Sequence, residues 1–280
     1  AETTLHLPFA LALYGEDRLL VADRNHFRVR RVDLKGYRVE TVAGNGKSFF
    51  RGDGGPGGGA TLDAPSGIVV DSRENVLFAD RLHQRVRKVA PDGIIRSVFG
   101  NGKQGSEGNK GPASEAALHL PDVLAIDRGD NIYITQRSGN VWIVRKVNAQ
   151  GVITHFAGNG TQGNSGDGGP ATEASFHTIS DINTDPAGNV YIADSVNRNI
   201  RKIDTQGVIS TIAEKSLVSL GVEVHPNGIV IDKVGNIIFS DSGSSKLRRI
   251  NLDGAIITIA GTGDFKDHGD GGPALQAGIR

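Results

Sequence analysis

The feature that most constrains the fold is a pattern that recurs five times along the 280 residues. Its most regular copy runs from Asn189 to Gly207, where a short apolar run ends at Asp194 and a polar turn leads into a second run that carries Arg201. The acid that ends the first of these runs recurs as Asp23, Asp80, Asp194 and Asp241, with Thr135 as the expected match in the third copy. Successive spacings of 57, 55, 59 and 47 residues indicate a repeat architecture.

Each copy contains four short apolar runs, which in the second copy span residues 67–70, 75–79, 85–89 and 94–99. The runs are rich in β-branched residues, are bounded by turn signals and lack the 3.6-residue period of a helix. Glycine, at 39 of 280 residues, is about twice its usual share of roughly 7%, which fits many turns between short strands. Four antiparallel strands per repeat predict an all-β fold, a β-propeller of four-stranded blades. A solenoid is the competing architecture, but its repeats are usually shorter and end in polar caps.

We expect a single propeller domain over residues 1–280, with repeats at approximately 5–61, 62–117, 118–175, 176–221 and 222–279. Leu5 to Pro8 open the first copy as Leu118 to Pro121 open the third, and Ile279 is the register equivalent of Leu5. This fits a five-blade ring whose termini meet, and it fits a piece of a longer array equally well. An incomplete ring would be expected to form homo-oligomers through its exposed edge strands.

Composition excludes several classes of protein. The absence of cysteine rules out disulfides, thiolate metal sites and cysteine nucleophiles. Equal numbers of basic and acidic residues, 31 each, argue against a nucleic-acid partner, and no apolar run is long enough to span a bilayer. The chain opens without methionine, as a processed product would, so a secreted or periplasmic location is the expectation.

A consensus can be read from four segments of the repeats, and it resembles the NHL repeat, a β-propeller family. The segments are 65–71, 188–194, 197–204 and 207–213. The Gly-Asp-Gly-Gly-Pro-Ala connectors, as at 166–171, resemble its bacterial and teneurin-like subgroup. The resemblance implies a propeller that most often has six blades, whereas five repeats are counted here. Metal-dependent lyases of this fold place histidine beside the proline that opens each first strand, and this chain has other residues there.

Most repeated polar residues are interpreted as structural. An arginine follows the strand-ending aspartate by seven residues in four copies, which predicts a charge-assisted pair; these are Arg30, Arg87, Arg201 and Arg248. The aspartates are expected to accept hydrogen bonds from the backbone of the turn beyond them. The glycine-rich connectors lack the spacing of a calcium loop and the lysine of a phosphate-binding loop.

The third copy departs from the pattern. It lengthens the hairpin before Arg145 and carries the only tryptophan, Trp142, which either packs in the blade or stacks on a ligand.

The positions that begin each first strand vary in chemistry while their surroundings repeat, as a binding surface would. In a propeller these positions lie at the channel mouth, and here they hold Phe9, Ser66, Asp122, Ser180 and Asn227, with Asp181 replacing the usual glycine.

These residues and Trp142 are the candidates for a non-catalytic binding propeller that recognises a protein or small ligand, without metal or cofactor. One alternative is a metal-dependent lactonase or lyase that uses Asp122, Asp181 and Asn227. Another is an excised or engineered array without an evolved ligand.

Overall fold

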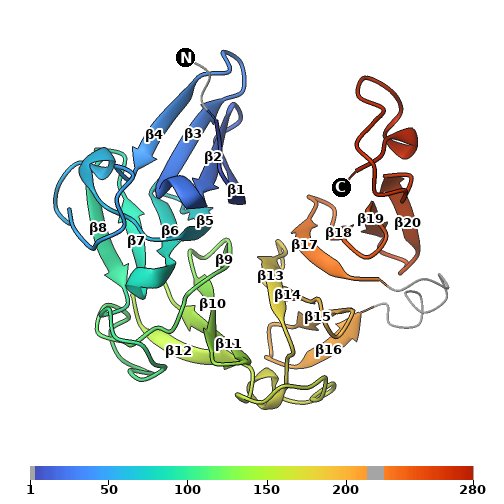
Figure 1. Ribbon diagram of the computed structural model, residues 1–280. Helices are drawn as coiled ribbons and strands as arrows, with labels where there is room; N and C mark the ends of the chain where they lie inside the picture. Colours follow the sequence, from blue (N-terminus) through green and yellow to red (C-terminus); the bar gives the residue numbers. More distant parts are fainter. Residues whose placement is uncertain (1–3, 213–223, 280) are drawn as a thin grey trace. The chain divides into compact units, whose positions relative to one another are not determined.

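The computed structural model describes residues 4–212 and 224–279. It confirms the prediction of an all-β propeller: five sheets, each of four antiparallel strands, follow one another along the chain (Figure 1). The expected boundary between the fourth and fifth repeats, at residues 221 and 222, lies outside the described residues, as does the fourth connector at 213–216. Within the described ranges, none of the helices has the length and apolar character needed to cross a membrane.

The strands of the first three blades are β1 (Pro8–Tyr14), β2 (Arg18–Asp23), β3 (Arg28–Asp33) and β4 (Val39–Ala43); β5 (Pro65–Val70), β6 (Val76–Asp80), β7 (Arg85–Val89) and β8 (Ile95–Phe99); and β9 (Leu124–Ile126), β10 (Ile132–Ser138), β11 (Val141–Val147) and β12 (Ile153–Ala157). Those of the last two blades are β13 (Ile179–Thr184), β14 (Val190–Asp194), β15 (Asn199–Ile203) and β16 (Ile209–Ile212); and β17 (Pro226–Ile231), β18 (Ile237–Asp241), β19 (Lys246–Ile250) and β20 (Ile256–Ala260). Short 3-10 turns, η1 (Arg24–His26) and η3 (Arg81–His83), follow the second strands of the first two blades.

Contacts divide the chain into two compact units. The first unit comprises residues 1–139 and 144–155, and the second comprises residues 140–143 and 156–280. The expected ring closure stays a prediction.

Each apolar cluster is built from successive blades. In the first unit, Leu20 of β2 and Phe78 of β6 belong to one fully buried cluster, and Val86 of β7 and Ile134 of β10 belong to another. In the second unit, Phe239 of β18 packs in a cluster with residues of β14 and β15. Because each blade buries an apolar face against a neighbour, the alternation in each strand specifies blade stacking as well as strand pairing.

The strand register corrects the alignment of the third copy. Ile134 pairs with Leu124 as Phe78 pairs with Ile68, so the equivalent of Asp80 is Gln136. Thr135 instead corresponds to the residue before the aspartate, which is alanine in the first, second and fourth copies and Ser240 in the fifth. The error arose because the third copy has no acid to mark the end of the strand, and in a sheet a slip of one residue moves every side chain to the opposite face.

Three of the connectors each contact the blade that follows them. Pro56, Pro112 and Pro170 each form an isolated bridge with the residue that precedes the last strand of the following blade. Gly44, with φ of 93°, carries the chain away from β4, and a Cβ there would lie 2.1 Å from Phe27 O. These contacts support the structural interpretation of the glycine-rich connectors.

Candidate functional site

The predicted channel-mouth residues lie where the first strand of a blade begins, and in four blades the backbone is irregular there. The pairing of the first and second strands slips between Pro8 and Leu11, Pro65 and Ile68, Ile179 and Asp181, and Pro226 and Ile229. Phe9, Ser66, Ser180 and Asn227 occupy these interruptions. A bulge re-aims side chains out of the regular alternation and is common beside binding sites.

In the first unit, Asp122 joins the starts of the second and third blades. Its carbonyl oxygen accepts hydrogen bonds from Gly67 N at 2.7 Å and from Ser66 Oγ at 2.9 Å. Ser66 is fully buried, and a Cβ on Gly67 would lie 2.4 Å from Leu124 N. Ser66 therefore fixes the backbone at Asp122, and this contact supports a structural role for it.

The carboxylate of Asp122 is surrounded by arginines. Its Oδ1 lies 3.5 Å from Arg81 Nε, yet within the described residues neither atom has a hydrogen-bond partner, although both are buried. Burial raises the pKa of Asp122, and the charges of Arg81, Arg24 and Arg137 oppose that shift. Three cations act on one carboxylate, so the local charge is positive.

Arg24 extends this cluster toward an exposed aromatic ring. Its guanidinium lies 4.5 Å from the centre of the Phe9 ring, which is 43% exposed. Burial lowers the pKa of Arg24, and the charge of Asp122 acts in the opposite direction. Phe9 and the arginines therefore present an apolar surface beside positive charge. We call Arg24, Arg81, Arg137 and Asp122 the arginine cluster.

The three arginines were missed at the level of sequence, although they share one repeat position. Arg24 follows Asp23, Arg81 follows Asp80, and Arg137 follows Gln136, which is the true equivalent of those aspartates. The fourth and fifth copies have Ser195 and Ser242 at this position. With the third copy aligned one residue too early, Arg137 fell out of the series and the pattern was hidden.

In the second unit, the candidates mostly hold the backbone together. Asp181 accepts hydrogen bonds from Ile182 N at 2.8 Å and from Ile229 N at 2.7 Å, one to each carboxylate oxygen. Burial raises the pKa of Asp181 to about 6, against the effect of these two bonds. Ser180 Oγ lies 2.9 Å from Asn227 O, and Asn227 itself is exposed. Asn227 is thus the candidate in this unit whose side chain faces solvent.

Trp142, the other candidate in the second unit, lies in β11 and is 7% exposed. A ring with so little accessible surface contributes mainly to packing. This burial favours the packing interpretation over ligand stacking.

The strand-ending aspartates accept hydrogen bonds, as predicted, but the backbone donors differ from the expected ones. They are N–H groups of the segment that leads into the first strand of the same blade, as in His6 to Asp23 at 2.8 Å and Asp63 to Asp80 at 2.7 Å. The turn beyond contributes a side chain instead, for example His83 Nδ1 at 2.9 Å from Asp80 Oδ2. Each aspartate therefore ties the start of its blade to the middle hairpin.

The predicted pairing of these aspartates with arginine is confirmed in three copies. Arg30, Arg87 and Arg248 lie 3.2, 3.1 and 2.8 Å from Asp23, Asp80 and Asp241, respectively.

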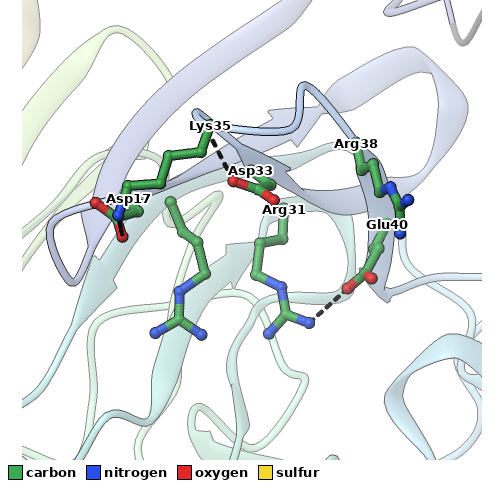
Figure 2. A pocket seen from close by; sticks show the side chains of 7 residues that line it. Asp17, Arg31, Asp33, Lys35, Arg38 and Glu40 are labelled. Carbon is green, nitrogen blue, oxygen red and sulfur yellow. Dashed lines mark hydrogen bonds and ion pairs between the residues drawn. The ribbon is translucent and has the colours of Figure 1, made fainter.

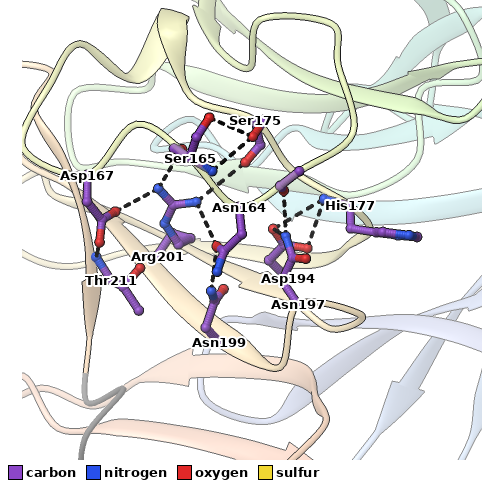
Figure 3. A network of polar contacts seen from close by, with 11 residues as sticks. Asn164, Ser165, Asp167, Ser175, His177, Asp194, Asn197, Asn199, Arg201 and Thr211 are labelled. Carbon is purple, nitrogen blue, oxygen red and sulfur yellow. Dashed lines mark hydrogen bonds and ion pairs between the residues drawn. The ribbon is translucent and has the colours of Figure 1, made fainter.

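In the fourth copy, the direct ion pair of Arg201 is with the connector residue Asp167, at 2.7 Å (Figure 3). Asp194 accepts hydrogen bonds from Asn197 Nδ2 at 2.7 Å and from the N–H groups of His177 and Thr178. Among the described contacts, Arg201 acts on Asp194 only through the electrostatic effect of its charge. The expected Asp194–Arg201 pair is therefore replaced by a pair with the connector.

A pocket of about 450 Å³ lies in the first blade and is lined only by charged residues: Asp17, Arg18, Arg31, Asp33, Lys35, Arg38 and Glu40 (Figure 2). Arg31 pairs with Glu40 and Lys35 pairs with Asp17, each at 2.5 Å. Hydrogen bonds from the Lys35 and Gly36 backbone lower the pKa of Asp33. Four basic and three acidic side chains line the pocket, so their charges largely cancel, and solvent screens the exposed pairs further.

Metal ligands do not cluster in the described part of the chain: residues 4–212 and 224–279 contain no group of three or more histidine or acidic side chains able to hold an ion. The two oxygens of Asp181 are already engaged by backbone N–H groups. The donor sets of Asp122 and Asp181 are therefore better matched to hydrogen bonding than to a divalent cation.

Comparison with known sequences identifies relatives of this chain. The model of the teneurin NHL domain matches residues 158–221. Mouse Teneurin-3 is 30% identical over 220 residues, and the chloroplastic protein SUPPRESSOR OF QUENCHING 1 of Arabidopsis thaliana is 29% identical over 214 residues. These alignments cover 70% and 74% of this chain but only 8% and 20% of the relatives, so the chain corresponds to a small part of each.

A solved structure of similar fold is that of a catalytically inactive virginiamycin B lyase from Staphylococcus aureus with quinupristin, with a TM-score of 0.59 and 15% identity. The match covers 90% of this chain and 69% of the lyase chain, and at this identity it shows the fold alone. Repeat consensus, blade topology, the family match and the teneurin relatives agree. The chain is an NHL-repeat β-propeller.

Proposed function

We propose that this propeller is a non-catalytic recognition module that binds a carboxylate-bearing small ligand or an acidic side chain of a protein partner at the arginine cluster. The observation that carries the proposal is the loose contact between Arg81 and Asp122. Their 3.5 Å ion pair leaves a buried donor and a buried acceptor without hydrogen bonds among the described residues. Buried polar atoms normally have partners, so unsatisfied ones at a positively charged site favour a bound group.

The chemistry of the arginine cluster favours an anion. Guanidinium groups bind carboxylates with paired, charge-assisted hydrogen bonds, and Arg24 and Arg81 are both partly buried, where such bonds are stronger. Phe9 supplies an exposed ring beside Arg24 for the apolar part of a ligand. Arginine and aromatic residues are also the side chains that dominate binding energy in protein interfaces.

The metal-dependent enzyme is the second reading, because a lyase shares the fold. The geometry favours it less, since Asp181 binds backbone N–H groups and Asp122 faces arginine rather than further acids. Metal analysis of purified protein separates the two readings. A stoichiometric divalent ion that is lost in Asp122→Asn would support the enzyme and contradict the recognition module.

The direct test is titration of the full chain with succinate and with a tetraglutamate peptide, followed by calorimetry. We expect saturable binding that weakens at least tenfold in Arg81→Gln and that weakens with added salt. Arg31→Gln, which removes an arginine of the charged pocket in Figure 2, is the matched control and should bind like the wild type. Absence of saturable binding to either probe, or equal binding by Arg81→Gln, would refute the proposal.

A further inference from the structure

The third blade contains a buried arginine, Arg145, whose equivalents in the other blades form ion pairs with aspartates. Arg145 of β11 is fully buried, and within the described residues none of its three guanidinium nitrogens has a hydrogen-bond partner. A buried charge without a partner is strongly unfavourable, because the lost hydration is not replaced. Burial also lowers the pKa of Arg145, and the charge of Glu107 acts against that shift.

The comparison with the second blade shows what is missing. There the equivalent residue, Arg87, is equally buried but contacts Asp80 at 3.1 Å and the connector residue Asp53 at 2.7 Å. In the third blade, the position of Asp80 is held by Gln136, and that of Asp53 is held by Asn109. Both carboxylates have therefore been replaced by neutral amides, while the arginine has been kept.

Gln136 does not replace the missing carboxylate partner of Arg145. It is fully buried, its Nε2 donates to Gly105 O at 3.3 Å, and its Oε1 has no partner among the described residues. The guanidinium offers five N–H donors, whereas the amide supplies one free acceptor and no charge. The site therefore has an excess of donors, and the charge of Glu107 acts on Arg145 without a hydrogen bond to its guanidinium among the described residues.

From this arrangement we propose that the space beside Arg145 is a binding site for a small monovalent inorganic anion of the halide type, which takes the place of the carboxylates found in the other blades. Full burial of Arg145 and Gln136 favours an ion that loses its hydration readily, as chloride and bromide do more than sulfate or phosphate. The ion would act as a structural counterion in the third blade. This site is distinct from the arginine cluster and does not depend on the proposed function.

Thermal unfolding of the full chain in sodium chloride, sodium bromide and sodium gluconate at equal ionic strength tests the proposal. A ligand that binds only the folded state raises its stability with concentration, and we expect Tm to be higher in the halides by about 3 °C or more. Gln136→Glu supplies an internal carboxylate and should abolish this difference. Gln150→Glu, which adds the same charge at an exposed turn of the same blade, should retain it.

Bromide anomalous diffraction gives the direct readout: a peak beside the Arg145 guanidinium in the wild type and none in Gln136→Glu. The proposal is overturned if the salts give equal Tm values in the wild type, or if the halide effect survives in Gln136→Glu. It is also overturned if Glu107→Gln lowers Tm while the wild type shows no halide effect, because Glu107 would then be the counterion.

Discussion

Replacement of Asp80 by asparagine tests the claim that the strand-ending aspartates are structural. Asp80 is fully buried and accepts from Asp63 N at 2.7 Å, His83 Nδ1 at 2.9 Å and Arg87 at 3.1 Å. Removing one partner of a buried ion pair costs about 3–5 kcal/mol, and because Arg87 keeps Asp53 at 2.7 Å we expect about 2–4 kcal/mol for this variant. At about 2–4 °C per kcal/mol in a chain of this size, Tm should fall by roughly 4–16 °C.

The measurement is urea unfolding followed by circular dichroism, with Tm from a thermal scan. Asp53→Asn is the matched control: it removes the other carboxylate from the same arginine, but Asp53 is 35% exposed, so the loss should be about 0.5–1 kcal/mol. If Asp80→Asn destabilises the protein no more than Asp53→Asn, burial is not what makes these pairs matter, and the reasoning fails.

Two further predictions concern pH. Because the folded-state pKa of Asp181 is raised from 3.8 to about 6, its contribution to stability is greatest below pH 3.8 and is lost as the pH rises through 6. NMR titration should therefore give a carboxyl pKa near 6, and a value below 4.5 would contradict the burial argument. For His83, burial disfavours the charged form, but the hydrogen bond and charge of Asp80 outweigh it and raise the pKa above 6.5. The stability gained from protonated His83 should be present below pH 6.5 and lost above the raised pKa. His83→Gln should remove this pH dependence of the free energy of unfolding. The exposed control His268→Gln should leave it in place.

Much of the fold follows from local pattern. The four short runs of each copy became four antiparallel strands, because alternation of apolar residues and turn signals are properties of a few neighbouring residues. The recurrence of aspartate and arginine seven residues apart likewise predicted the pairs made by Arg30, Arg87 and Arg248, since the two residues lie diagonally across one hairpin, two positions apart.

The candidate site was less accessible to this kind of reasoning. Phe9 and Asp122 were identified from their variation at a repeated position, but Arg24 and Arg81 were not, because their distance from Asp122 depends on how separate blades pack. The Ser66 hydroxyl donates to the Asp122 carbonyl oxygen and the Asp181 carboxylate accepts from Ile229 N, and these partners lie about 50 residues away in the chain.

By itself, the sequence determined the repeat, the strand pattern, the connectors and hence the propeller family, because each of these is encoded within one copy. Only the tertiary structure decided which charges meet beyond a single hairpin. It placed Gln136 in register with the aspartates, paired Arg201 with Asp167 instead of Asp194, and left the buried Arg145 guanidinium without a hydrogen-bond partner among the described residues. The physical reason is that burial and ion pairing join residues from different strands and connectors, and their distances are fixed by packing that no single repeat contains.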